Sequence, residues 1–182
     1  MESTRGQLLI AGPRLIDPNF WRTVVLIVEH SDDGALGLVL NRPSETSVGE
    51  AVPELEELVD SGDPLFIGGP VQPSTVITVA EFTDVSEAAL VAFADIGVLG
   101  TSGPPIEEMA DRIVTARAFV GHSGWGPGQL EAEIEHGDWI LEPARRDDVF
   151  SAGPRELWSS VLTRKGGSYA LVARMPLDPT LN

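Results

Sequence analysis

The sequence predicts a mixed α/β sandwich, in which helices pack against a central sheet of mostly antiparallel or mixed pairing. An uninterrupted apolar, β-branched run at residues 23–28 is typical of a strand covered on both faces. The turn sequence Ser31-Asp-Asp-Gly34 and a second apolar run follow, which favours an antiparallel hairpin. Strand-like and helix-like segments then alternate irregularly, which argues against a regular doubly wound sheet. With 182 residues, we expect one domain spanning residues 1–182.

The first half of the chain is expected to contribute most of the sheet. Strands are predicted at residues 7–11, 23–28, 35–40, 65–67 and 75–81. Ser47 and Glu50 have the spacing of a capping box, which predicts a short acidic helix from there to about Asp60. Gly68, Gly69 and a proline end the strand at 65–67. Residues 86–99 fit a helix and a strand equally well.

The second half is expected to supply most of the helices. Pro104 and Pro105 open a predicted helix whose apolar face holds Ile106, Met109, Ala110, Ile113 and Val114. A strand is predicted at 118–120, a helix at 129–136 that Gly137 ends, a strand at 139–141 and a helix at 154–164. Between the strand at 118–120 and the helix at 129–136, the glycine-rich stretch 121–128 is interpreted as a strand-to-helix turn around Trp125.

Composition excludes several classes of function. The chain has 28 acidic and 12 basic residues and a formal net charge of −16, which disfavours direct binding to a nucleic acid. Glycine follows the single lysine, Lys165, so there is no P-loop. Without cysteine, the chain has no disulfide, thiolate zinc site or iron–sulfur cluster. With neither a signal-peptide pattern nor a run of about twenty apolar residues, we expect a cytoplasmic protein outside the membrane.

The glycine-rich stretch carries an incomplete catalytic motif. Gly121-His-Ser-Gly-Trp125 is similar to the G-x-S-x-G nucleophile elbow, but Trp125 replaces the second glycine, so Ser123 is interpreted as a hydrogen-bonding residue. Backbone amides at the following helix could bind an anion. The glycine spacing fits no phosphate-binding fingerprint, however, and carboxylates follow it. Tight helix–strand packing around Trp125 is therefore the favoured interpretation.

Polar residues near strand ends are the remaining candidates for a site. Glu29, His30 and His122 could form a metal or acid–base site, but no metal-binding histidine spacing is present, so we predict neither a metal, nor a cofactor, nor a catalytic residue. Arg22 and Arg42 lie near turns, where each could receive a carboxylate or phosphate or pair with an internal acid.

Several motifs occur together in an order that resembles the YqgE/AlgH family. They are Gly6-Gln-Leu-Leu-Ile-Ala11, Asp17-Pro-Asn-Phe20, Gly37-Leu-Val-Leu-Asn-Arg-Pro43, Gly68-Gly-Pro-Val71, Gly124-Trp-Gly-Pro-Gly-Gln-Leu-Glu131 and, at the end, Asp178-Pro-Thr-Leu-Asn182. The resemblance implies a small cytoplasmic bacterial protein with an α+β fold whose sheet curls partly into a barrel. Members are described as transcriptional regulators, without an agreed ligand, reaction or DNA-reading motif.

Together these observations predict a non-enzymatic regulatory or ligand-binding module that acts without direct DNA binding. Its partner is an unidentified protein or small molecule, and its oligomeric state stays open. The expected binding residues are Arg22, Glu29, His30, Asn41, Arg42, Gly69, Trp125 and Gln129. The alternative is a small hydrolase-like enzyme that uses Glu29 or His30 with Arg22 as electrostatic support.

Overall fold

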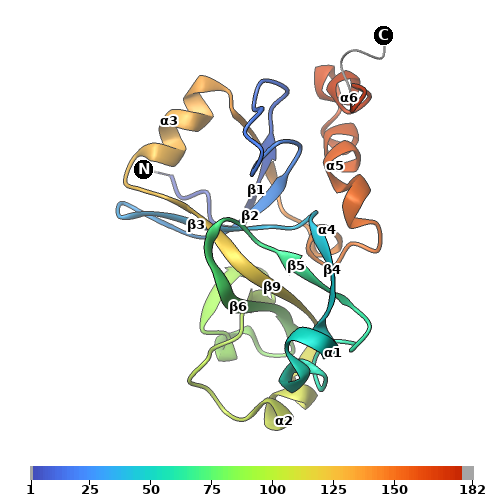
Figure 1. The fold of residues 1–182 in the computed structure, drawn as a ribbon. Helices are drawn as coiled ribbons and strands as arrows, with labels where there is room; N and C mark the ends of the chain where they lie inside the picture. The colour runs from blue at the N-terminus through green and yellow to red at the C-terminus, as the bar shows by residue number, and fades with distance from the viewer. Residues whose placement is uncertain (1, 178–182) are drawn as a thin grey trace.

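A computed structural model describes residues 2–177, and the family-like motif at 178–182 lies outside this part. Ten strands form one open sheet with short helices packed against it, which confirms the predicted α+β class (Figure 1). The strands are β1 Gln7–Ala11, β2 Val24–Ser31, β3 Gly34–Val39, β4 Pro43–Ser47, β5 Pro64–Ile67, β6 Val71–Phe82, β7 Leu90–Phe93, β8 Ile96–Val98, β9 Ile113–Trp125 and β10 Trp139–Pro143.

The helices are short, and none has more than nine residues among the described ones. They are α1 Val48–Ala51, α2 Ile106–Met109, α3 Gln129–His136, α4 Arg146–Val149, α5 Leu157–Lys165 and α6 Ser168–Val172. Four 3₁₀ turns accompany them: η1 Pro53–Leu55, η2 Val85–Glu87, η3 Ala110–Arg112 and η4 Pro154–Glu156. Within residues 2–177, no helix combines the length and the apolar character needed to span a bilayer.

The sheet is antiparallel with one exception. Its strand order is β10-β1-β2-β3-β9-β6-β8-β7, and β4 joins it through β5, which pairs in parallel with β9. The predicted hairpin is confirmed by the β2–β3 register, in which Leu26 faces Leu38 and Ser31 faces Gly34. The sheet curls until β7 contacts β2 without closing, so the barrel-like curvature is partial.

The longest strand, β9, corrects two predictions. Ile113 and Val114 belong to β9 and not to the helix opened by Pro105, because β9 pairs with β6 along most of its length. This long-range ladder outweighs the local helical spacing. The stretch from Gly121 to Trp125 also continues β9, so the strand-to-helix turn is confined to residues 126–128.

Other boundaries also differ from the sequence prediction. The ambiguous segment 86–99 holds the two strands β7 and β8, while β4, α4 and α6 were not predicted. The capping box is confirmed, because Ser47 Oγ accepts from the N–H of Glu50 and Glu50 accepts from the N–H of Ser47. The helix nevertheless ends at Ala51, well before Asp60, because Pro53 cannot continue its hydrogen bonding.

Three apolar clusters lie around the sheet. The first packs α5 against the face that carries Leu8 and Leu26. The second packs α3 against the opposite face, where Trp125 and Trp139 are buried. The third surrounds α1 and α2. Since helices cover both faces of β1 and β2, their near-continuous apolar sequences are buried on both sides, as expected for such runs.

Candidate functional site

The loop before β2 has an uncommon backbone conformation at Arg22. Its φ is +52°, in the left-handed region that side chains other than glycine rarely adopt. Asn41 holds it there from the end of β3: its Nδ2 donates to the Arg22 carbonyl at 2.8 Å, and its Oδ1 accepts from the N–H of Val24 at 2.9 Å. Two residues predicted for the site therefore lie together, joined by the β2–β3 register.

Arg42 fixes the same loop from a second direction. Its Nη1 donates to the carbonyl of Asn19 at 2.7 Å, and its Nη2 donates to those of Pro18 at 3.2 Å and Trp21 at 3.3 Å. Burial lowers the pKa of the Arg42 guanidinium, and the charge of Asp17 offsets part of this effect. Since three loop carbonyls occupy its donors, Arg42 is a positioning residue for the loop.

The Arg22 side chain lies on a surface made by two tryptophans. Its guanidinium carbon is 4.5 Å from the ring centroid of Trp158 and 5.2 Å from that of Trp21. Its Nη2 donates to the carbonyls of Met175 at 2.7 Å and Pro176 at 2.6 Å. Within residues 2–177 it forms no ion pair, and burial lowers its pKa. Aromatic faces and carbonyl dipoles thus stabilise this partly buried cation.

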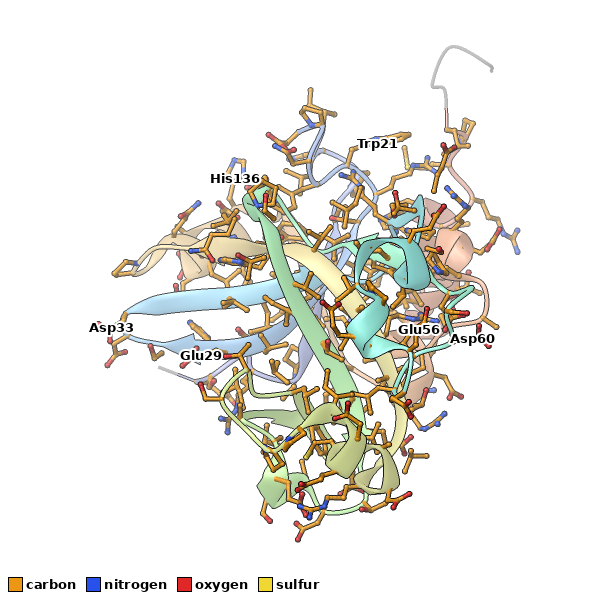
Figure 2. All side chains as sticks on the ribbon, turned by 60° about the horizontal axis from the view of Figure 1, so that its bottom comes forward. Trp21, Glu29, Asp33, Glu56, Asp60 and His136 are labelled. Carbon is orange, nitrogen blue, oxygen red and sulfur yellow. The ribbon has the colours of Figure 1, made fainter. Side chains whose placement is uncertain are left out.

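A cavity of about 130 Å³ adjoins this guanidinium, and we call it the Arg22 pocket. Trp158 forms one wall and is fixed by a hydrogen bond from its Nε1 to the carbonyl of Ala11 at 2.9 Å. The lining residues are Gly12, Pro13, Ile16, Trp21, Arg22, Trp158, Met175, Pro176 and Leu177. Trp21 is 40% exposed at the rim, where Figure 2 shows it at the molecular surface. The pocket therefore combines apolar walls with one cation.

Glu29 and His30 lie at the other end of β2. Glu29 is exposed and lies well apart from Trp21 in Figure 2. The ring of His30 is held between two partners: its Nδ1 accepts from the N–H of Thr4 at 3.0 Å, so its Nε2 carries the proton that it donates to Glu131 at 2.8 Å. At about 3.3 Å per strand residue, Arg22 is roughly 25 Å from His30 along β2. The structure does not bring Arg22 together with Glu29 or His30.

Trp125 and Gln129 belong to a hydrogen-bonded aromatic cluster on the other face of the sheet. The indole Nε1 atoms of Trp125 and Trp139 each donate to the same oxygen of Glu133 at 2.8 Å. Gln129 donates to the second oxygen at 2.9 Å, and Phe20 packs against both indoles. Sequence reasoning assigned Glu133 to a solvated helix face. The two tryptophans that flank its helix in the sequence could have indicated that Glu133 has buried partners. That both indoles reach Glu133 depends on the order of strands in the sheet, which no local pattern shows.

Gly69, Ser123 and His122 form a close backbone crossing. A Cβ on Gly69 would lie 2.3 Å from the His122 carbonyl oxygen. Ser123 is fully buried, and its Oγ donates to the carbonyl of Gly68 at 3.2 Å, so this hydroxyl is not available as a nucleophile. The Nδ1 of His122 is buried and has no hydrogen-bond partner among the described residues, and burial lowers the pKa of its ring.

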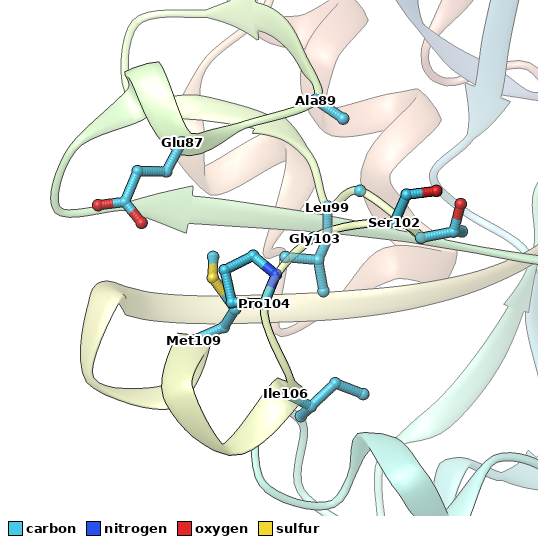
Figure 3. Close-up of a pocket in the computed structure, with 10 residues that line it drawn as sticks. Glu87, Ala89, Leu99, Ser102, Gly103, Pro104, Ile106 and Met109 are labelled. Carbon is cyan, nitrogen blue, oxygen red and sulfur yellow. The ribbon is translucent and has the colours of Figure 1, made fainter.

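A larger cavity, of about 350 Å³, lies beside the loop before α2. Figure 3 shows Leu99, Pro104, Ile106 and Met109 around it, with Glu87 at one side. Glu87 is paired with Arg112 at 2.7 Å, so the cavity holds no free charged group. Among residues 2–177, no three His, Asp or Glu side chains are arranged to bind a metal ion.

Comparisons with known proteins identify similar chains over nearly the full length. The sequence model of the AlgH-like family matches residues 8–170. A UPF0301 protein of Thermobifida fusca is 43% identical over 191 residues, which cover 99% of this chain and 96% of that protein. A UPF0301 protein of Streptomyces coelicolor is 38% identical over 188 residues, covering 100% and 97%.

Two solved structures share the fold. A crystal structure of a protein from Corynebacterium diphtheriae superposes with a TM-score of 0.86 at 31% identity, covering 95% of this chain and 93% of that one. The solution structure of the AlgH protein from Pseudomonas aeruginosa gives a TM-score of 0.72 at 28% identity, covering 98% and 100%. The fold is therefore shared with both proteins over nearly the whole length of each chain.

Proposed function

This chain belongs to the AlgH-like family, and we propose that it is a non-enzymatic binding module with the Arg22 pocket as its ligand site. The ligand class is a carboxylate next to a small apolar group. The protein acts in the cytoplasm by binding this ligand. It neither converts the ligand nor contacts DNA directly.

One observation carries this proposal: Arg22 is the single charged residue lining the pocket, and within residues 2–177 it has no counter-ion. Arg42 and Arg117 also lack an ion pair among the described residues, but neither lines this cavity, so the cation that the pocket presents to a ligand is Arg22. Its left-handed backbone adds support, because conformations that cost about 1–3 kcal/mol persist where surrounding bonds enforce them, often at functional sites. Asn41 and Arg42 supply those bonds.

The charge of the guanidinium favours a carboxylate. Its hydrogen bonds to Met175 and Pro176 both use Nη2, so the N–H groups of Nε and Nη1 are left for single charge-assisted hydrogen bonds to a ligand. The apolar walls of Trp21, Trp158 and Ile16 fit a branched alkyl or aromatic group, because the cavity holds the volume of roughly four water molecules. Both parts of the ligand would thus find a partner within one pocket.

The hydrolase alternative has less support than binding. It requires Arg22 to assist Glu29 or His30, but these residues lie at opposite ends of β2. His30 is also engaged by Thr4 and Glu131 on both ring nitrogens. A general base has to reach the proton that it removes, and a ring held on both sides does not.

The test is a titration with N-acetyl-L-leucine and N-acetyl-L-phenylalanine, followed by calorimetry, with the corresponding amides as uncharged controls. We expect the acids to bind and the amides to bind at least about tenfold more weakly, because a charge-assisted hydrogen bond is lost. Arg22→Lys should weaken binding of the acids by about tenfold, since lysine lacks the planar guanidinium that lies on the two indole rings and bonds to the carbonyls of Met175 and Pro176. The matched control, Arg112→Lys, changes an arginine distant from the pocket and should leave affinity unchanged.

Two results would contradict the proposal. Equal affinity for acids and amides would show that the guanidinium does not recognise the ligand. Conversion of any of these compounds would show an enzyme. A shift of duplex DNA at low salt would instead support direct nucleic-acid binding, which the charge of −16 argues against.

A further inference from the structure

Within residues 2–177, the outer edge of β10 has no partner strand. β10 is the terminal strand of the sheet as described, and it pairs with β1, where Leu8 faces Glu142 and Ile10 faces Ile140. The N–H of Gly12 donates to Asp138 and the N–H of Ala144 donates to Gly6, so the even-numbered residues of this segment bond toward β1. Backbone groups alternate in direction along a strand. Those of Trp139 and Leu141 therefore point away from the sheet.

Lys165 occupies part of this edge. Its Nζ donates to the carbonyl of Leu141 at 2.8 Å and to Oε2 of Glu142 at 3.2 Å. In the described part of the chain, this is the one hydrogen bond formed by the outward-pointing groups of Trp139 and Leu141. The ammonium stands where an N–H of a further strand would stand. Lysine at an edge is a known means of preventing unwanted strand pairing.

A slot runs along the edge and continues the plane of the sheet. A cavity of about 570 Å³ is bounded by Ile134 and Gly137 at α3 and by Tyr169 and Val172 of α6. A second cavity of about 390 Å³ meets it at Ile134 and Leu141. Figure 1 shows α3 and the α5–α6 pair on opposite sides of β1. An added strand would lie about 4.8 Å from β10 and could pair with the outward backbone groups of Trp139 and Leu141, so the slot suits an extended segment.

The charge around the slot points to a basic occupant. The second cavity is lined by Glu2, Glu131 and Glu135, and Glu142 lies beside the edge. Lys165, the single cation lining the first cavity, already contacts Glu142. A second copy of this chain would bring another net charge of −16, and Pro143 has no N–H to pair across a two-fold axis. Charge complementarity therefore favours a basic peptide over self-association.

We propose that the outer edge of β10 binds an extended basic peptide as an added strand. The peptide carbonyl accepts from the N–H of Leu141, its N–H groups donate to the outward carbonyls, and its basic side chains face Glu135 and Glu2. Lys165 leaves the carbonyl of Leu141 when the peptide binds. This is the strand-addition mode of peptide recognition, in which backbone bonds supply affinity and side-chain pockets supply specificity. It does not depend on the Arg22 pocket.

The test uses ¹⁵N-labelled protein and the probe acetyl-Arg-Val-Thr-Val-Thr-Val-Arg-amide. We expect the amide of Leu141 to become protected from hydrogen exchange on binding. Leu141→Pro removes the outward N–H and leaves the hydrogen bonds to β1 in place. Leu141→Ala is its control, because it also removes the leucine side chain but keeps that N–H. Binding should be at least tenfold weaker in the proline variant than in the alanine variant. Lys165→Met should bind the probe severalfold more tightly, because the competing ammonium is gone.

The controls separate the proposal from other readings of the same surface. A probe with Glu in place of both Arg residues should bind at least tenfold more weakly. Circular dichroism and thermal unfolding of Leu141→Pro report whether the rest of the fold is intact, independently of the slot and of the Arg22 pocket. Equal affinity of the proline and alanine variants, or equal affinity for the acidic probe, would overturn the proposal. So would dimerisation of Lys165→Met without probe binding, which would identify a second copy as the occupant.

Discussion

The indole of Trp125 and the carboxylate of Glu133 are joined by a hydrogen bond of 2.8 Å that links the end of β9 to α3. Trp139 of β10 donates to the same carboxylate oxygen, although β1, β2 and β3 lie between β10 and β9 in the sheet. Two buried indoles thus share one acceptor, and each would lose its partner if that acceptor were removed. The aromatic cluster therefore fixes α3 against the sheet.

Glu133→Ala should destabilise the protein by about 2–4 kcal/mol, because two buried N–H donors are left unsatisfied at about 1–3 kcal/mol each. Glu135→Ala is the matched control, since Glu135 lies on the same helix and is exposed. It should change the free energy of unfolding by less than about 0.5 kcal/mol. Urea denaturation followed by circular dichroism measures both. Equal values for the two variants would contradict the role given to Glu133.

Gly69→Ala should destabilise the protein by about 3 kcal/mol or more. Gly69 has φ of +154°, and a Cβ there would lie 2.3 Å from the backbone of His122, which cannot move without breaking β9. In Gly124→Ala, the same change within the same crossing, the new Cβ would meet only Val71 Cγ2 at 3.9 Å, an ordinary contact. Thermal unfolding of both variants checks this difference. A Gly69→Ala protein as stable as Gly124→Ala would show that the crossing is not tight.

Local features of the sequence were sufficient for the elements that depend on neighbours along the chain. The β2–β3 hairpin follows from an apolar run and a turn, and the capping box at Ser47 needs only residues three apart. β4 could not be predicted, because Pro43–Ser47 has no apolar alternation and exists through its pairing with β5. The length of β9 likewise depends on β6, which lies far away in sequence.

The site divides in the same way. Arg22, Asn41 and Arg42 were chosen for their residue types, and the hairpin register explains why Asn41 reaches Arg22. The walls of the Arg22 pocket were missed because they include Trp158 from α5 and residues 175–177. No local pattern connects those segments to the loop before β2. Trp125 and Gln129 were also predicted as binding residues, and they pack with Glu133 of α3, where Phe20 of the loop before β2 contacts the indole of Trp125.

Ser123→Ala should cost only about 0.5–1.5 kcal/mol of stability, the usual contribution of one hydrogen bond, because the buried hydroxyl donates to the carbonyl of Gly68. Binding of N-acetyl-L-leucine should be unchanged. The native protein should also resist a fluorophosphonate probe, which labels activated serines. Labelling that disappears in Ser123→Ala would mean that this serine is reached by solvent and activated, and it would restore Ser123 as a candidate nucleophile.

His122 should make the folded protein sensitive to mild acid. Burial lowers the pKa of its ring below the ordinary value of 6.5, so the unfolded chain binds this proton more readily than the folded chain does. Stability from this group is therefore complete above about pH 6.5 and is lost as the pH falls toward the lowered pKa. His122→Gln, which cannot titrate, should show a shallower decline in the free energy of unfolding between about pH 7.5 and 5. The other titrating groups are the same in both proteins. The difference between the two slopes of unfolding free energy against pH therefore reports His122. Parallel slopes would mean that solvent reaches the ring in the folded state.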